Sequence, residues 1–265
     1  MEMTIVVIWM SVLLTSTLSG VLGMGGGVIL MFSLLSVLPV RDAMVLHGLV
    51  QLVANGARAL THREHIWWRC TGWYAFGCGI AITCLASINW LPDRRAVYLL
   101  GGVIPLLQFT PIKQLQLDIA RRSHALVCGG LITAGQISAG AAGPLLDAFF
   151  SQTGKGRYGI IATKSTTQVL SHLIKVTYFA VLGSHWLSNH GKTGLQGVTN
   201  DWTANTILAD SSGAMILVGS LVFAVAGTRF GTRILARISE QRFARFSRLL
   251  LIALSAYSFS KLMSW

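Results

Sequence analysis

Charged residues are scarce in this chain, and acidic residues are the scarcest of them. Only 11% of the 265 residues are charged, 53% are hydrophobic, and nine are Asp or Glu. A soluble globular protein carries about twice that share of charge, because its surface must face water. The composition therefore excludes a soluble protein and predicts an all-α protein that crosses the lipid bilayer several times.

Recognisable catalytic and cofactor motifs are also lacking. The four cysteines have no CxxC spacing, and no HExxH pair, paired aspartates or serine with a partnered base occurs at a known spacing. We therefore expect no cofactor, no metal and no enzymatic activity. A membrane-embedded enzyme and a purely structural membrane subunit are the weaker alternatives.

Positive charge is present but divided into short blocks. The net charge is +12, yet the basic residues stand between apolar segments and form no continuous basic face, so we expect no nucleic-acid partner. The densest block runs from Arg229 to Arg248, with Glu240 as its only acid. Basic loops remain on the cytoplasmic side of membranes, so the sequence predicts that this block is cytoplasmic.

Internal repetition is the most informative feature. The motifs GMGGGVILMF and GAAGPLLDAFF lie in the two halves at a constant offset of 117 residues. At this offset the matching pairs are Gly23 with Gly140, Gly26 with Gly143, and Phe32 with Phe149. The chain therefore divides into a first repeat, 1–112, and a second repeat, 113–265, within a single membrane domain.

The glycine motifs predict breaks in membrane helices. A run such as Gly25, Gly26 and Gly27 inside an apolar segment leaves backbone amides exposed, which is costly unless they line a cavity or contact a ligand. A short helix that begins at such a break directs its free amides and positive dipole end at the cavity, which favours an anion. Gly143 and Pro144 can start the matching helix, because proline in the first turn loses no needed donor. Close packing of helices through small residues is the competing explanation.

Two polar stripes follow the glycine motifs at the same offset. The first comprises His47, Gln51, Asn55 and Arg58, and the second comprises Lys164, Gln168, His172 and Lys175. Each spacing places its members on one face of a helix. Polar groups inside a membrane are expensive and usually mark a transport pathway, although Arg58 could also reach the interface from a helix end.

These features together predict a substrate-binding site for a small anion. Glutamine side chains can donate hydrogen bonds to an oxygen-rich solute, and the basic residues supply a positive field. The predicted set is Gly25, Gly26, Gly27, Gln51, Asn55, Arg58, Gly143, Gln168, His172 and Lys175. The near absence of acidic residues from the apolar segments also favours an anion over a cation.

The topology that fits best consists of two inverted repeats. In each repeat a re-entrant or broken helical hairpin at the glycine motif precedes three transmembrane helices, near 43–62, 67–90 and 95–111 and near 158–183, 207–228 and 248–264. This arrangement keeps most basic loops cytoplasmic. The alternative is eight full crossings with parallel halves, which would place one basic loop outside.

The chain resembles the TauE/SafE family, also called the 4-toluene sulfonate uptake permease family. The resemblance rests on GMGGGVILMF, its counterpart GAAGPLLDAFF and the following ATKSTTQVLSHLIK. It implies a multi-pass protein of the bacterial inner membrane that exports sulfite or an organosulfonate such as sulfoacetate. The chain departs from the family pattern at Met31 and Phe32 and at Ala141 and Ala142. The sequence does not decide between a carrier and an anion channel, and it does not identify the coupling ion. It also leaves the oligomeric state open, and a homo-oligomer is one option.

Overall fold

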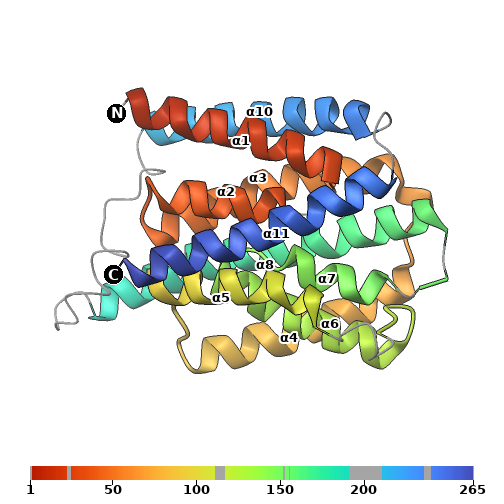
Figure 1. The fold of residues 1–265 in the computed structure, drawn as a ribbon. Coiled ribbons are helices and arrows are strands. Elements are labelled where there is room, and N and C mark those ends of the chain that lie inside the picture. Colours follow the sequence, from red (N-terminus) through yellow and green to blue (C-terminus); the bar gives the residue numbers. More distant parts are fainter. Residues whose placement is uncertain are drawn as a thin grey trace.

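The computed structural model describes residues 2–22, 25–110, 117–151, 153–154, 156–190, 211–235 and 240–264, and over these residues it contains helices and no strands. The α-helices are α1 (Glu2–Leu22), α2 (Gly26–Leu35), α3 (Val40–Thr61), α4 (Trp68–Ser87), α5 (Arg94–Leu106), α6 (Arg122–Ala139), α7 (Gly143–Phe150), α8 (Arg157–His190), α10 (Ser211–Leu235) and α11 (Glu240–Met263). Most of them lie side by side in one bundle (Figure 1). The predicted all-α class is confirmed.

Membrane-spanning character is clearest in three helices of the described part of the chain. The segments Met3–Gly20, Trp68–Ser87 and Gly213–Gly231 are long and apolar enough to cross a bilayer. Large apolar side chains stand exposed on these helices, among them Leu14, Phe76 and Val222. An outer surface of this kind is suited to lipid and unsuited to water.

Both glycine motifs reverse the chain. Gly25 and Gly140 have φ angles of 79° and 77°, a left-handed conformation that glycine adopts without strain. After the first reversal, Gly26 packs against Thr15 and Ser19 of α1, so α2 lies beside the helix that precedes it. After the second, the amide of Ile119 donates to the carbonyl of Phe149 at 3.0 Å, so the end of α7 returns to the start of α6.

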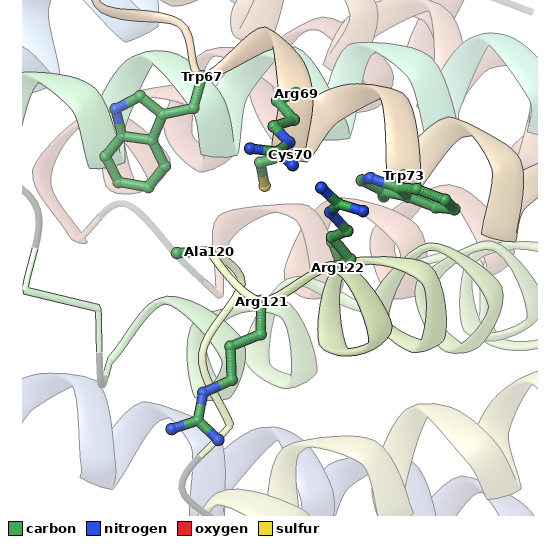
Figure 2. A pocket seen from close by; sticks show the side chains of 8 residues that line it. Trp67, Arg69, Cys70, Trp73, Ala120, Arg121 and Arg122 are labelled. Atoms are coloured by element: carbon green, nitrogen blue, oxygen red, sulfur yellow. The ribbon is translucent and has the colours of Figure 1, made fainter.

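The long helices pack in matching pairs. Helix α1 lies along α10 and α6 lies along α4, while α3 contacts α8 and α5 contacts α11. Gly77 of α4 and Gly129 of α6 each face backbone of the opposite helix with no room for a methyl group. Glycine therefore brings α4 and α6 into backbone contact, and their N-terminal ends lie together (Figure 2).

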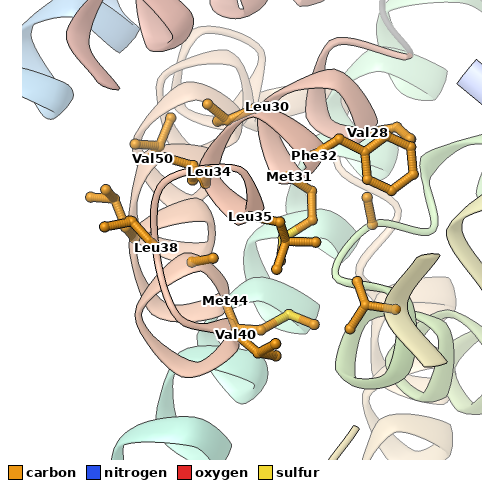
Figure 3. Close-up of a cluster of buried hydrophobic side chains, with 14 of the residues drawn as sticks. Val28, Leu30, Met31, Phe32, Leu34, Leu35, Leu38, Val40, Met44 and Val50 are labelled. Carbon is orange, nitrogen blue, oxygen red and sulfur yellow. The ribbon is translucent and has the colours of Figure 1, made fainter. Parts of the chain in front are cut away.

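The core surrounds the two short helices. Helix α2 is apolar on all sides. The side chains of α2 that are buried in the core include Leu30, Met31, Phe32, Leu34 and Leu35 (Figure 3). A second apolar cluster surrounds α7 and includes Leu146, Phe149 and Phe150. This packing fixes the N-terminal ends of α2 and α7 inside the bundle, where the candidate site lies.

Candidate functional site

The two breaks and the two polar stripes meet at one small cavity of about 30 Å³. Its lining residues are Ser19, Gly25, Gly27, Val28, His47, Gln51, Asn55, Gln136, Ala141, Ala142, Gly143, Pro144, Gln168 and His172. Seven of the ten predicted site residues are among them, namely Gly25, Gly27, Gln51, Asn55, Gly143, Gln168 and His172. Residues more than 100 positions apart in the sequence are thus brought together.

Two short helices begin at this cavity. Helix α2 starts after Gly25 and α7 starts after Ala142, and neither N-terminus has a side chain that caps it. Pro144 lies in the first turn of α7, as predicted. The first amides of a helix have no partner within it, and they carry the positive end of the helix dipole. The cavity therefore lies between two positive helix ends.

A glutamine lies beside each break. A methyl group added to Gly27 would lie 3.3 Å from Nε2 of Gln51, and one added to Gly143 would lie 3.7 Å from Nε2 of Gln168. Each glutamine therefore contacts the glycine motif of its own half. The amide nitrogens are donors that an oxygen atom in the cavity could use.

Lys175 connects the two breaks behind the cavity. Its Nζ donates to the carbonyl of Gly140 at 2.9 Å and lies 2.7 Å from Nδ1 of His47. Because a carbonyl oxygen only accepts, Nε2 of His47 donates to the carbonyl of Gly27 at 2.8 Å, and Nδ1 of a neutral His47 then accepts from Lys175. Gly48 gives the lysine room, since a methyl group there would lie 3.3 Å from Cε of Lys175.

Several buried polar atoms at the cavity have no hydrogen-bond partner among the described residues. They are Oδ1 of Asn55, Oε1 of Gln136 and Nδ1 of His172. Buried polar groups are nearly always paired, so unpaired ones indicate a place for water or solute. A volume of about 30 Å³ has room for a water molecule and is too small for an anion with four heavy atoms. The cavity is therefore too small for such an anion in this conformation.

Three predicted site residues do not line the cavity. Gly26 packs against α1, and Lys175 bonds to His47 and to the carbonyl of Gly140 without lining the cavity itself. Arg58, in the last turn of α3, donates from Nε to the carbonyl of Ala54 at 3.3 Å. Any contribution of Arg58 and Lys175 to a positive field stays a prediction.

Seven lining residues lie outside the predicted set, and two of them, Ser19 and Gln136, belong to neither a glycine motif nor a polar stripe. Ser19 and Gln136 line the cavity from α1 and α6, and they are separated by the same 117 residues as the two motifs. Lys164 of the second stripe forms an ion pair with Asp147 of α7. The repeat offset of 117 residues relates Ser19 to Gln136 and could have identified them from the sequence. The spacing of Asp147 and Lys164 did not indicate that they form an ion pair.

A metal site does not form in the described ranges, where no three His, Cys, Asp or Glu side chains gather. The lining groups are amides, imidazoles, small side chains and helix N-termini. Donors of this kind suit an anion, because none of them supplies the carboxylates that hard cations prefer.

Membrane transporters are the class that this architecture defines. Broken helices whose positive ends face a polar cavity inside an apolar bundle are typical of secondary transporters. The chain matches the family model described as Sulfite exporter TauE/SafE over residues 8–258, and it belongs to this family. No curated protein and no solved structure matches the chain.

Proposed function

We propose that the protein is a secondary transporter that exports a small sulfur-containing anion, sulfite or an organosulfonate such as sulfoacetate, across a bacterial inner membrane. The observation that carries this proposal is the meeting of two helix N-termini and two glutamine amides at one cavity. Membership of the TauE/SafE family supports the substrate class. An anion export function also fits the absence of acidic residues from the lining of this cavity, as far as the chain is described.

The proposed binding mode uses both halves equally. Gln51 and Gln168 donate to oxygens of the anion from opposite sides, while the first amides of α2 and α7 face it along the helix dipoles. His172 and Asn55 complete the polar wall. Because the cavity is too small for such an anion, the proposed binding requires the two glycine breaks to move apart.

We propose that residues 1–112 and 113–265 are inverted repeats with this cavity near the bilayer midplane. The helix pairs support it, because α1 lies along α10 as α6 lies along α4, and α3 and α5 each contact their own counterparts, α8 and α11. Helices that are equivalent under the repeat offset, for example α3 and α8, run in opposite directions (Figure 1). Inverted repeats give a transporter two related conformations that open to opposite sides.

Export needs no coupled ion in a cell that is negative inside. An anion leaves such a cell downhill by roughly 2.3 kcal/mol per charge for each 100 mV. A carrier cycle in which the empty protein returns is therefore sufficient. The small volume of the cavity, about 30 Å³, favours a carrier over an open channel.

The test is sulfite flux in proteoliposomes with Gln51→Leu and Gln168→Leu. Each substitution removes one hydrogen bond to a charged solute, so we expect flux at low sulfite to fall roughly 10- to 100-fold. Thr177→Leu, at an exposed position on α8, is the matched control and should leave flux unchanged. Unchanged flux in both glutamine variants would overturn the site assignment, and absence of counterflow in the parent protein would indicate a channel.

A further inference from the structure

A second and larger cavity lies at one end of the bundle. Its volume is about 460 Å³, and it shares no lining residue with the polar cavity. The residues that line it are Trp67, Arg69, Cys70, Trp73, Ala120, Arg121, Arg122 and Ala125. They come from the start of α4 and from the start of α6 with the segment before it, so the cavity joins the two predicted repeats (Figure 2).

Two arginines face each other across this cavity. Arg69 is in the first turn of α4 and Arg122 is the first residue of α6, and Figure 2 shows their guanidinium groups approaching from the two helices. The guanidinium carbon of Arg122 lies 5.9 Å from the ring centroid of Trp73. Within the described ranges neither arginine forms an ion pair with a carboxylate. Arg121 points away from the pair (Figure 2).

The two helix ends add to this positive charge. Helices α4 and α6 run in the same direction, since Sγ of Cys70 donates to the carbonyl of Ile119 and Nε1 of Trp90 donates to Oγ of Ser138. Neither helix has a side chain that caps its N-terminus or an acidic residue in its first turn. Asp118, in the segment before α6, accepts from the amide of Ala120 at 2.9 Å. Helix N-termini and guanidinium groups at one place make an anion-binding site.

An apolar strip leads away from the cavity along α4. Trp73, Phe76 and Ile80 occupy successive turns of one helix face, and they are 36%, 60% and 46% exposed. A free inorganic anion gains nothing from such a strip, whereas the acyl chains of a lipid would cover it. The tryptophans at the helix start are placed as interface residues, at the depth where lipid head groups lie.

We propose that this cavity binds the phosphate head group of an anionic phospholipid of the cytoplasmic leaflet. Arg69 and Arg122 hold the phosphate, the N-terminal amides of α4 and α6 face it, and the acyl chains lie along the apolar strip on α4. The basic segments 62–69 and 113–122 flank the cavity, and the inverted topology predicted from the sequence places both in the cytoplasm. A basic cavity between membrane helices on this side is suited to an anionic head group.

The test is native mass spectrometry of the full-length protein in mild detergent. The probes are phosphatidylglycerol, phosphatidylcholine with the same acyl chains, and inorganic phosphate. We expect phosphatidylglycerol to bind at least about tenfold more tightly than phosphatidylcholine. Since each arginine near an anionic lipid contributes roughly fivefold, Arg69→Gln with Arg122→Gln should weaken phosphatidylglycerol binding by roughly 25-fold.

The matched control removes the same charge elsewhere. Arg229→Gln with Arg233→Gln, both exposed on α10, should change binding by less than about twofold. If the Arg69 and Arg122 double variant does not fold, Arg122→Gln alone should weaken binding by roughly fivefold. Equal binding of the two lipids, equal loss in the control pair, or phosphate binding as tight as lipid binding would each overturn the proposal.

Discussion

The two glycine breaks occupy equivalent places in the chain but are built differently. Gly26 and Gly143 are separated by the repeat offset, and each is the first residue of its short helix. At Gly26 an added methyl group would meet the backbone of Thr15 and Ser19, whereas at Gly143 its nearest neighbour would be the side chain of Gln168, at 3.7 Å. The first glycine therefore serves close helix packing, and the second leaves space beside the cavity.

The anchors of the two short helices differ as well. His47 and Lys164 are equivalent in the repeat, yet His47 bonds the carbonyl of Gly27, whereas Lys164 pairs with the carboxylate of Asp147. The residue equivalent to Asp147 in the first half is Leu30, which is fully buried. Apolar packing holds both short helices, but His47 adds one hydrogen bond at α2, whereas Lys164 adds an ion pair at α7. Related motifs can thus reach the same backbone shape with different stabilising forces.

The largest effect should come from alanine at the first break. Gly26→Ala forces a methyl group against backbone that cannot move freely, so we expect a loss of about 1–3 kcal/mol in stability, or failure to fold. Gly143→Ala should lose less than about 1 kcal/mol of stability, because the added methyl group would lie at an ordinary van der Waals distance from its neighbours. Thermal unfolding in detergent measures both, with Gly56→Ala as control in open space. Equal losses at Gly26 and Gly143 would remove the distinction between the breaks.

A double-mutant cycle tests the ion pair at the second break. Asp147→Asn or Lys164→Met alone leaves one charge in a mostly buried place without its partner. The stability losses of the two single variants should therefore add up to more than the loss measured in the double variant. We expect a coupling energy of about 1–2 kcal/mol in thermal unfolding. Additive effects would mean that the pair does not anchor α7.

The smallest effect should be on transport, from Gly27→Ala. The added methyl group would lie 3.3 Å from Nε2 of Gln51, so the glutamine must shift by a few tenths of an ångström. We expect sulfite flux to fall a few-fold with little change in melting temperature, since misplaced binding groups cost rate more than stability. A variant with full flux would indicate that Gln51 does not need this position.

The sequence predicted the breaks and the stripes because both depend on local pattern. Gly25 and Gly143 mark the helix starts to within one residue, and the spacing from Gln51 to Asn55 and from Gln168 to His172 defines one face of α3 and one of α8. Helical periodicity and glycine chemistry are sufficient for such predictions.

What the sequence could not predict depends on how helices from different halves meet. Arg58 shares the face of Gln51, yet its place in the last turn of α3 keeps it away from the cavity. Gln136 was not predicted because the residue at the equivalent position of the first half is a serine, Ser19, so the repeat offset joins two side chains of different type. The cavity between Arg69 and Arg122 exists only because glycines allow α4 and α6 to touch, which no periodicity within either helix indicates.

The hydrogen bonds of Lys175 connect the two halves of the chain. One nitrogen atom holds the carbonyl of Gly140 directly and that of Gly27 through the ring of His47. A hydrogen bond is lost when its two atoms move apart by more than about 1 Å. Neither break can therefore move far on its own unless these hydrogen bonds are broken. In the proposed transport cycle, opening of the cavity would therefore involve both glycine breaks together and would require the hydrogen bonds of Lys175 to break.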